Sequence, residues 1–364
     1  MKLLYATSIG FPSPLANRIQ TLAMAEAFCA ILKDDFVFGF GWKEGDMKIN
    51  CHHIEMGKGL KSYRLAWKYL RFAKESGITT VYCREEKLLF FFILYRSIFY
   101  RELDIIYEVH YLVYLKHFWY RVMLRKMLGV VSITHGMKDI LIKNGFCEEN
   151  IIVAPDAVSP EMFSIKTTKE KARARLGLPS DKKIILYTGS ITQTWKGAPL
   201  LIECARLFGD EFLFVIVGGK SHHLDKFRKT YNPGANVLTV GQKSHEDIPE
   251  YLQTADVLVL PNSNKEEISR TFTSPMKLFE YMMAEKPIVA SDIDSVREVL
   301  NKKNAMLVKP DDAEALAAGI RLTLESPAVT DALVRQAKKD VALCTWENRA
   351  KKIITAIAKW KNKK

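Results

Sequence analysis

Short runs of apolar, β-branched and aromatic residues alternate with longer segments of mixed polarity along nearly the whole chain. Six such runs in the first half predict strands: KLLYAT, DFVFGF, TTVYC, DIIYEV, VVSIT and NIIVAP. The segments between them carry apolar residues at helical spacing, as at Ile19, Leu22, Ala23, Ala27 and Ile31. This alternation predicts an α/β fold, in which parallel sheets are joined by crossover helices.

The alternation is interrupted once, by a polar stretch rich in Lys and Arg, and then starts again. Six further runs predict a second set of strands: KIILYTG, FLFVIVGG, NVLTVG, DVLVLP, KPIVAS and AMLVKP. A chain of 364 residues is long enough for two cores. We expect two doubly wound, Rossmann-like domains, residues 1–160 and 165–345, with a linker within residues 159–182.

In open parallel sheets, ligands bind beyond the carboxyl ends of the strands. Two such domains facing each other would form a cleft between those ends. The residues that directly follow each strand are therefore the first candidates for a functional site.

One candidate follows the strand KIILYTG. Gly189 ends this strand, Lys196 and Gly197 precede a helix, and Pro199 lies in the first turn of that helix. A lysine beside a helix start predicts a phosphate or diphosphate site, although a solvated lysine in a turn would have the same sequence. The loop has neither the GxxxxGK[ST] nor the GxGxxG spacing, so neither an ATPase loop nor a dinucleotide loop is predicted.

A second candidate is the segment SRTFTSPMKLFEYMMAEKPIVASD. We expect a helix with Ser274 as N-cap and Pro275 as first residue, running to about Ala284. Lys277 and Glu280 then share one face near free backbone N–H groups. The cation can hold a diphosphate while the carboxylate accepts two ribose hydroxyls; the alternative is an ordinary surface pair of charges.

With these segments in order, the chain resembles the retaining glycosyltransferases of family four, which have the GT-B fold and use sugar nucleotides. The resemblance is carried in the second half by TGSITQTWKG, VIVGG, VGQKSHEDIPEYLQTADVLVLPNS, SPMKLFEYMMAEKPIVASD and NAMLVKPDDAEALAAGI. In the first half it is carried by SPLANRIQTLAMAEAF, YEVH and VAPDAV followed by MF. The ordered combination is specific, although each piece alone is weak.

The resemblance implies that Lys196 binds the donor diphosphate and that Glu280 binds the ribose. It also implies that the backbone of Gly241, Gln242 and Lys243 faces the base of a UDP- or GDP-linked sugar. The complete set of expected donor-binding residues is Gly189, Ser190, Lys196, Gly241, Gln242, Lys243, Ser274, Pro275, Met276, Lys277 and Glu280.

The chain departs from the family pattern at two positions. Members usually have a glutamate eight positions before the ribose-binding one, and this chain has Phe272 there. Many members have an arginine where this chain has Ser190. The departures leave the donor sugar open, and Lys277 or Arg270 is expected to supply part of the missing phosphate or sugar contact.

In the first domain, a helix is expected to begin near Ala16 and to bring Asn17 and Arg18 to the cleft as acceptor-binding residues. His110 follows the strand DIIYEV, and Glu108 lies two residues earlier on the same side. We expect His110 to contact a sugar hydroxyl or the acceptor, and we count His110, Lys196 and Glu280 as catalytic. A structural role for Arg18 or for His110 is the alternative.

The resemblance implies retention of anomeric configuration by front-face attack, with the leaving diphosphate acting as base. No protein nucleophile is then required, and the protein positions the reactants and stabilises the charge of the leaving group. No carboxylate cluster predicts an obligatory metal, and no other cofactor is expected. A lysine and helix N-termini can neutralise the diphosphate instead.

The net charge of +13 predicts a polyanionic partner. Residues 58–74 (KGLKSYRLAWKYLRFAK) contain six basic residues, no acidic one and several aromatic side chains, and similar segments follow in LLFFFILYRSIFYR and HFWYRVMLRKML. They predict docking on an anionic membrane and a lipid-linked acceptor, unless they are core-facing helices with solvated lysines. Nucleic acid is not expected, because the segments match no RNA-binding signature.

The remaining expectations concern location and the end of the chain. The longest apolar run, residues 88–95, is far shorter than the roughly twenty residues that a spanning helix needs. The first residues predict a strand rather than a secretory signal, so we expect a cytoplasmic protein, peripheral at the inner face of the cell membrane. A helix over residues 346–362 is expected to pack back on the first domain. A GT-B sugar-nucleotide epimerase and a non-catalytic sugar-nucleotide-binding scaffold are the alternative functions.

Overall fold

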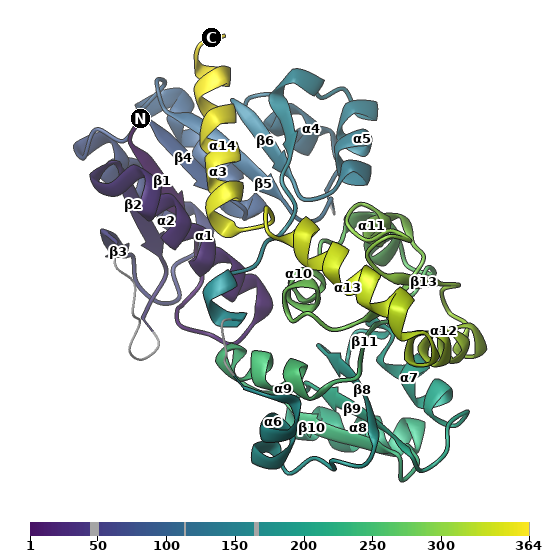
Figure 1. The fold of residues 1–364 in the computed structure, drawn as a ribbon. Helices are drawn as coiled ribbons and strands as arrows, with labels where there is room; N and C mark the ends of the chain where they lie inside the picture. The colour runs from purple at the N-terminus through teal and green to yellow at the C-terminus, as the bar shows by residue number, and fades with distance from the viewer. Residues whose placement is uncertain (44–50, 113, 164–166, 364) are drawn as a thin grey trace. The chain divides into compact units, whose positions relative to one another are not determined.

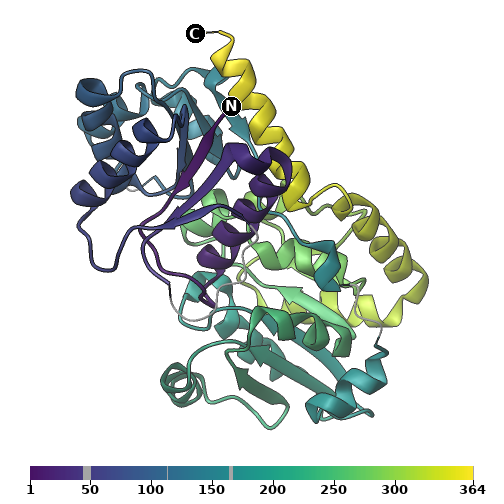
Figure 2. The same cartoon turned by 90° about the vertical axis from the view of Figure 1, so that its left-hand side faces the viewer.

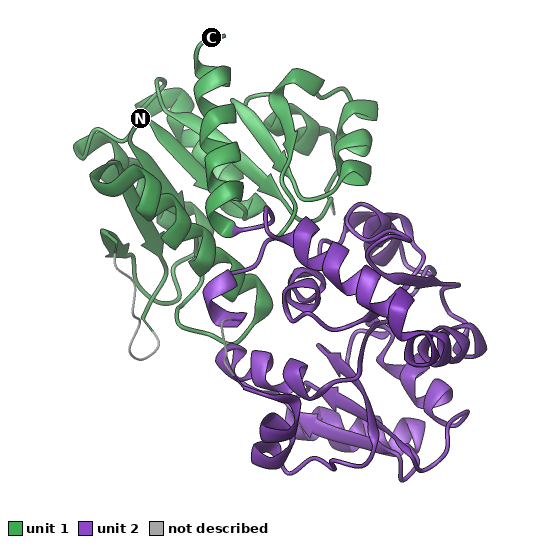
Figure 3. Ribbon diagram, viewed as in Figure 1, with its two compact units in different colours: residues 1–156, 346–364 green, residues 157–345 purple. Residues whose placement is uncertain are grey.

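The computed structural model describes residues 1–43, 51–112, 114–163 and 167–363 (Figure 1). The chain forms two compact units (Figure 3): unit 1 comprises residues 1–156 and 346–364, and unit 2 comprises residues 157–345. Residue 165, where the second domain was expected to begin, lies outside the described residues. The division between the units falls at residue 156, a few residues before the expected boundary.

Unit 1 contains a seven-stranded parallel sheet with the strand order β3-β2-β1-β4-β5-β6-β7. Its strands are β1 (Leu3–Ala6), β2 (Phe36–Phe40), β3 (His53–Glu55), β4 (Thr80–Cys83), β5 (Asp104–Val109), β6 (Gly129–Ser132) and β7 (Ile151–Val153). Every residue of β1, β2, β4, β5 and β6 is buried, which explains their continuous apolar sequences. All six predicted strands are present, and β3 is an additional one.

Helices cover both faces of this sheet. They are α1 (Ala16–Leu32), α2 (Ser62–Glu75), α3 (Glu86–Phe99), α4 (Phe118–Leu124), α5 (His135–Lys143) and α14 (Trp346–Lys361), with short 3-10 segments η1 (Lys33–Asp35) and η2 (Glu148–Asn150). α1 and α14 pack together on one face, and α2 and α3 pack together on the other (Figure 2). The expected helix start at Ala16 is confirmed.

The C-terminal helix α14 is an integral part of unit 1. It packs against α1 and β6. A Cβ atom on Gly129 would lie 2.2 Å from the ring of Trp360, so only glycine leaves room for this side chain on β6. The Trp360 Nε1–H donates to the carbonyl of Glu149 at 2.8 Å. The last segment of the chain thus completes the core of the first unit.

Unit 2 contains a six-stranded parallel sheet with the strand order β10-β9-β8-β11-β12-β13. Its strands are β8 (Lys183–Thr188), β9 (Phe212–Val217), β10 (Val237–Gly241), β11 (Val257–Leu260), β12 (Ile288–Ser291) and β13 (Met306–Val308), and they match the six predicted runs. Its helices are α6 (Lys169–Leu176), α7 (Ala198–Ala205), α8 (Ser221–Tyr231), α9 (Ile248–Thr254), α10 (Met276–Met283), α11 (Asp294–Arg297), α12 (Ala313–Glu325) and α13 (Pro327–Val341). Short helical turns are η3 (Pro160–Phe163), η4 (Thr194–Lys196), η5 (His245–Asp247) and the π-helical η6 (Ile268–Phe272).

The interpretation of residues 159–182 as a linker is wrong for its middle part. Helix α6 lies there and packs against α9 within unit 2. The side chain of Arg173 is buried, donating to the carbonyl of Thr254 at 3.0 Å and to the carboxylate of Asp256 at 2.6 Å. A buried ion pair with further hydrogen bonds fixes a helix whose sequence looks entirely solvated.

The predicted start of α10 is wrong by one residue. Pro275 is the N-cap, with an extended backbone (φ −76°, ψ 123°), and Met276 is the first helical residue. Ser274 therefore precedes the cap. The predicted end near Ala284 is correct, because Ala284 is the C-cap.

Candidate active site

The expected donor-binding residues of unit 2 gather at one place in the sheet. The strand order reverses between β8 and β11, which are neighbours in space although β9 and β10 separate them in the chain. The carboxyl ends of strands at such a reversal form the usual ligand site of doubly wound sheets. Lys196 lies in the loop after β8, and Lys277 and Glu280 lie on α10, between β11 and β12.

Two glycines allow the loop after β8 to lie close to its neighbours. Gly197 has φ 81°, and a Cβ atom there would lie 1.8 Å from the carbonyl oxygen of Pro261, just after β11. Gly189 has φ 143°, a conformation that L-residues rarely adopt. The Ser263 N–H donates to the carbonyl of Trp195 at 2.8 Å. The loops after β8 and β11 are therefore held together at the strand ends.

Lys277 is the most unusual residue of this site. Its Nζ is buried, has no hydrogen-bond partner among the described residues, and lies 4.0 Å from the centre of the Tyr187 ring. A Cβ atom built on Gly189 would lie 3.4 Å from this Nζ. Burial, followed by the charge of Lys196, lowers the pKa of Lys277 well below its usual range. A buried amine without a partner costs free energy, which an incoming anion would recover.

Lys196 supplies a second amine near the first. It is half-buried, and its Nζ lies 5.1 Å from the centre of the Trp195 ring. Burial lowers the pKa of Lys196 as well. The two ammonium groups repel each other when both are charged. An anion bound between them at the carboxyl end of the sheet would neutralise both.

Glu280 is fixed by a contact that the sequence did not predict. Its Oε1 lies 2.7 Å from Nε2 of His245, in the turn after β10. The next residue on α10, Tyr281, accepts from the Thr188 N–H at 2.8 Å through its hydroxyl oxygen. These contacts hold α10 against the end of β8, so Glu280 is kept in a defined position beside Lys277.

The expected base-binding turn is partly occupied by internal contacts. Gly241 has φ 90°, and the Gln242 N–H donates to the carbonyl of Gly219 at 2.8 Å. Lys243 is exposed and lies 5.9 Å from the centre of the Tyr251 ring. The backbone N–H of Gln242 is therefore already used within unit 2.

The two residues expected to compensate for the family departures, Lys277 and Arg270, have different surroundings. The Arg270 guanidinium donates to the carbonyl of Asn264 at 3.2 Å. Ser190 is half-buried, and its hydroxyl lies 2.9 Å from that of Thr192. The Lys277 amine, in contrast, lies near Gly189, next to the position where many members carry an arginine. Phe272 is buried.

Sequence reasoning also missed Asn262, the second residue after β11. This side chain is fully buried, and neither its oxygen nor its nitrogen has a hydrogen-bond partner among the described residues. An asparagine at a strand end gave no signal in the sequence, since such residues are common in turns. Its unsatisfied amide is a further polar group at the carboxyl end of β11.

In unit 1, His110 belongs to a buried polar network at the carboxyl end of β5. Its Nε2 contacts Oε1 of Glu108, whose other oxygen accepts from Tyr82 and from Arg349 of α14, the latter at 3.0 Å. Burial alone would raise the pKa of Glu108, but the charge of Arg349 and the contact with His110 hold that pKa well below its usual range. Glu108 is therefore an ionised acceptor.

This network fixes the protonation of His110. Burial, followed by the charge of Arg84, lowers the pKa of His110 to about 4, although Glu108 acts in the opposite direction. The imidazole is then neutral near pH 7, and Nε2 carries the proton that it donates to Glu108. Nδ1 is left as an acceptor, suited to a hydroxyl group of a substrate.

The pKa of His110 predicts a pH dependence of stability. Between pH 6.5 and about 4 the unfolded imidazole takes up a proton that the folded one does not, so the free energy of unfolding decreases as the pH falls through this range. We expect His110→Gln to reduce this decrease, measured by urea denaturation across the range. His52→Gln, at an exposed histidine, should leave it unchanged; equal effects would contradict the assignment.

The expected acceptor residues lie at the start of α1. Asn17 is exposed, and its carbonyl accepts from Arg84 at 3.2 Å. The Arg18 guanidinium donates to the carbonyl of Gly10 at 3.1 Å, which gives it a structural contact. A role in acceptor binding stays a prediction for both. Among the described residues, no group of three His, Cys, Asp or Glu side chains could hold a metal ion.

Part of the chain is similar in sequence to a known protein family. Residues 168–340, nearly all of unit 2, match the family Glycosyl transferases group 1. Over 192 residues the chain is 29% identical to the putative teichuronic acid biosynthesis glycosyltransferase TuaC of Bacillus subtilis, covering 52% of this chain and 45% of TuaC.

A second relative is named for a lipid-linked substrate. Over 161 residues the chain is 30% identical to the N,N'-diacetylbacillosaminyl-diphospho-undecaprenol alpha-1,3-N-acetylgalactosaminyltransferase of Campylobacter jejuni, covering 44% of this chain and 40% of the relative. The chain spans less than half the length of these two curated relatives.

Solved structures resemble the whole chain. The HepE protein of Anabaena, in complex with UDP, superimposes with a TM-score of 0.79 and 16% identity, covering 99% of this chain and 100% of HepE. At this identity the likeness concerns the fold alone. The expected α/β, GT-B fold with two Rossmann-like sheets is confirmed.

Proposed function

We propose that this protein is a retaining glycosyltransferase that transfers a sugar from a nucleotide-diphosphate sugar to a hydroxyl group of a glycan or lipid-linked acceptor. The observation that carries the proposal is the buried amine of Lys277 beside Lys196, where the strand order of unit 2 reverses; this amine has no hydrogen-bond partner among the described residues. A diphosphate would neutralise both amines. UDP is the first nucleotide to test, because HepE was solved in complex with UDP.

In this proposal the donor is held by groups from three segments: the loop after β8, α10 and the turn after β10. Lys196 and Lys277 bind the diphosphate, and Glu280, oriented by His245, accepts hydrogen bonds from the ribose hydroxyls. The backbone of residues 241–243 faces the base. Lys277 takes over the role of the family arginine that is Ser190 here, and Phe272 removes one carboxylate from the sugar pocket.

The proposed reaction needs no nucleophile from the protein. The bond between the anomeric carbon and the β-phosphate oxygen breaks, and the acceptor oxygen forms the new bond on the same face of the sugar. The acceptor proton goes to the departing diphosphate oxygen, whose charge Lys196 and Lys277 stabilise. His110 accepts a hydrogen bond from a sugar or acceptor hydroxyl through Nδ1.

The acceptor assignment is supported by the relatives. TuaC is named for teichuronic acid biosynthesis, and the Campylobacter enzyme for a diphospho-undecaprenol substrate. We propose a role in bacterial surface polysaccharide assembly at the cytoplasmic side of the cell membrane, with Asn17 and Arg18 near the acceptor. An epimerase would convert the nucleotide sugar into its epimer without an acceptor, and a scaffold would bind the nucleotide sugar without turnover. Release of UDP that depends on an acceptor therefore favours the glycosyltransferase over both.

The role of Glu280 can be tested by nucleotide binding. A hydrogen bond to a charged group contributes about 1.5–3 kcal/mol, so we expect Glu280→Ala to raise the dissociation constant of the bound nucleotide at least about tenfold. Thermal-shift titration with UDP, GDP and ADP measures this effect. Glu203→Ala removes an exposed glutamate from α7 and serves as the control. An unchanged nucleotide response in Glu280→Ala would refute the ribose assignment.

A further inference from the structure

Exposed apolar side chains concentrate on three helices of unit 1. Among the described residues, sixteen large hydrophobic side chains are exposed, and half of them lie on α2, α3 and α4. These eight, with exposed fractions from 38% to 74%, are Tyr63, Trp67, Phe90, Leu94, Ile98, Phe99, Phe118 and Trp119, and we call them the aromatic face. Isolated exposed side chains need no explanation, but a concentration of this kind marks an interaction surface.

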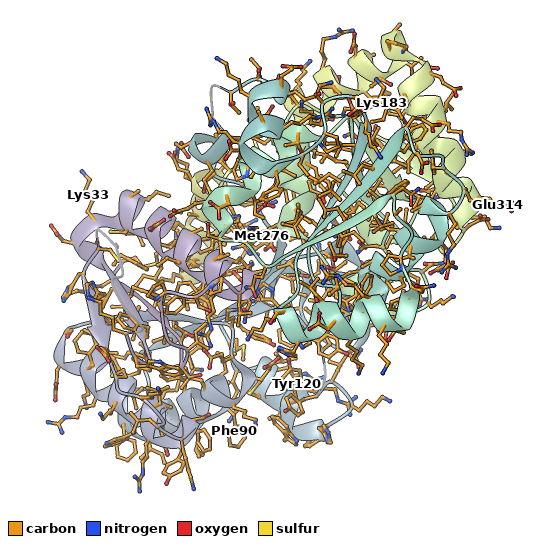
Figure 4. All side chains as sticks on the ribbon, turned by 90° about the horizontal axis from the view of Figure 1, so that it is seen from below. Lys33, Phe90, Tyr120, Lys183, Met276 and Glu314 are labelled. Atoms are coloured by element: carbon orange, nitrogen blue, oxygen red, sulfur yellow. The ribbon has the colours of Figure 1, made fainter. Side chains whose placement is uncertain are left out.

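Ring contacts make the aromatic face continuous across the three helices. The ring of Trp67 on α2 lies 4.7 Å from that of Phe99 on α3. The ring of Phe90 on α3 lies 5.6 Å from that of Trp119 on α4. Figure 4 shows Phe90 at the periphery of unit 1, where side chains project away from the ribbon. The face is therefore one surface rather than three separate patches.

The chain segment that carries this surface exposes many more basic than acidic residues. Between residues 58 and 126, two acidic residues, Glu75 and Glu102, are exposed. The eleven exposed basic residues of the same segment are Lys58, Lys61, Arg64, Lys68, Arg71, Lys74, Lys87, Arg101, Lys116, Arg125 and Lys126. Glu75 is already paired with Arg71, at 2.7 Å. The partner of this surface must therefore bring negative charge of its own.

We propose that the aromatic face and its basic rim dock unit 1 on an anionic lipid bilayer. Aromatic side chains favour the boundary between acyl chains and headgroups, and each nearby Lys or Arg strengthens attraction to anionic lipids. No described helix is long and apolar enough to cross a membrane, so the attachment lies on the surface. A second copy of the chain fits less well, because the same excess of positive charge would meet itself.

The role of this docking rests on the proposed function, because a unit 1 attached to a membrane would meet a lipid-linked acceptor. Its physical basis is separate, since unit 1 carries the docking surface and unit 2 carries the nucleotide site. If the docking surface is wrongly assigned, vesicle binding fails while nucleotide binding remains. If the nucleotide site is wrongly assigned, nucleotide binding fails while vesicle binding remains.

The test is flotation of the full-length protein with phosphatidylglycerol–phosphatidylcholine vesicles and with phosphatidylcholine vesicles alone. We expect binding to the anionic vesicles that weakens as salt is added. Arg64→Glu with Lys68→Glu should weaken it at least about tenfold. Lys352→Glu with Lys359→Glu changes the net charge equally, at exposed positions of α14, and should retain more of the binding.

A second pair of variants tests the apolar part of the surface. Ile98→Ser with Phe118→Ser removes two of the most exposed members of the aromatic face and should also reduce vesicle binding. Leu322→Ser with Leu343→Ser removes similarly exposed side chains from unit 2 and should not. All variants should keep the far-UV circular dichroism spectrum and the thermal midpoint of the wild-type protein, which shows that they are folded.

Two results would overturn the proposal. One is that the wild-type protein does not bind anionic vesicles at low salt. If sedimentation then shows that the protein self-associates, and Ile98→Ser with Phe118→Ser abolishes this association, the surface binds a second copy of the chain instead. The other is equal loss of binding in the face variants and their controls. A protein that binds vesicles but no nucleotide would leave the docking surface standing and refute the proposed function.

Discussion

Replacing Lys277 by methionine is expected to stop sugar transfer while making the ligand-free protein more stable. The variant removes a buried amine for which the described part of the chain offers no hydrogen-bond partner, so the thermal midpoint should rise. Loss of one preorganised charge-stabilising group typically lowers the catalytic rate by about 10²–10³-fold, and we expect a loss of this size in acceptor-dependent UDP release. The opposite signs of the two effects distinguish this result from a folding defect.

Lys286→Met is the matched control for Lys277→Met. Lys286 is a half-buried lysine beyond the other end of α10, and burial also lowers its pKa. Its replacement should leave the transfer rate within a few fold of wild type. Retention of activity in Lys277→Met, or an equal loss in both variants, would contradict the assignment of the diphosphate site.

A rescue variant makes the same test sharper. The family arginine is absent at Ser190, and the Lys277 amine lies near the preceding residue, Gly189. Adding Ser190→Arg to Lys277→Met should therefore restore part of the lost activity, since the guanidinium would return a cation to the diphosphate. If the double variant recovered no activity, Lys277 would not substitute for that arginine.

Replacing Arg349 by methionine is expected to give the largest loss of stability. The Arg349 and Glu108 side chains are 3% and 0% exposed, and Nη1 lies 3.0 Å from Oε2. Removing one partner leaves a buried carboxylate without its main counter-charge, which costs about 3–5 kcal/mol. Urea denaturation followed by circular dichroism measures the loss.

The control for Arg349→Met is available on the same helix. Lys351 pairs with Glu347 at 2.6 Å, but both side chains are more than half exposed. Lys351→Met should cost at most about 1 kcal/mol, because solvent screens an exposed ion pair. If the two variants were equally destabilised, the loss would come from a lower stability of helix α14 itself and not from the broken ion pair between Arg349 and Glu108.

Most strands of the fold were predictable because they are buried on both faces. Such strands have continuous apolar sequences that one chain displays without homologues. β3 was missed because it is short and two of its three residues are exposed. α6 was missed because its sequence, KEKARARL, looks solvated, whereas Arg173 is buried by an ion pair with Asp256, which follows α9.

Site residues were predictable where their position follows from spacing within one segment of the sequence. Contacts between segments that are distant in the sequence were not predictable. Lys196, Lys277 and Glu280 lie at strand ends or helix starts, positions that the sequence indicates. The contact of His245 with Glu280 joins residues 35 positions apart, and that of Arg349 with Glu108 joins residues 241 apart. No spacing rule connects such pairs.

The inclusion of α14 in unit 1 has a consequence for biosynthesis. Residues 1–156 emerge from the ribosome well before Arg349 and Trp360 are synthesised. At that stage Glu108 lacks the Arg349 counter-charge and β6 lacks the Trp360 side chain that packs on it. Folding of this unit can be completed only after the intervening unit has been synthesised. Gene fragments that end before residue 346 are therefore expected to yield insoluble product.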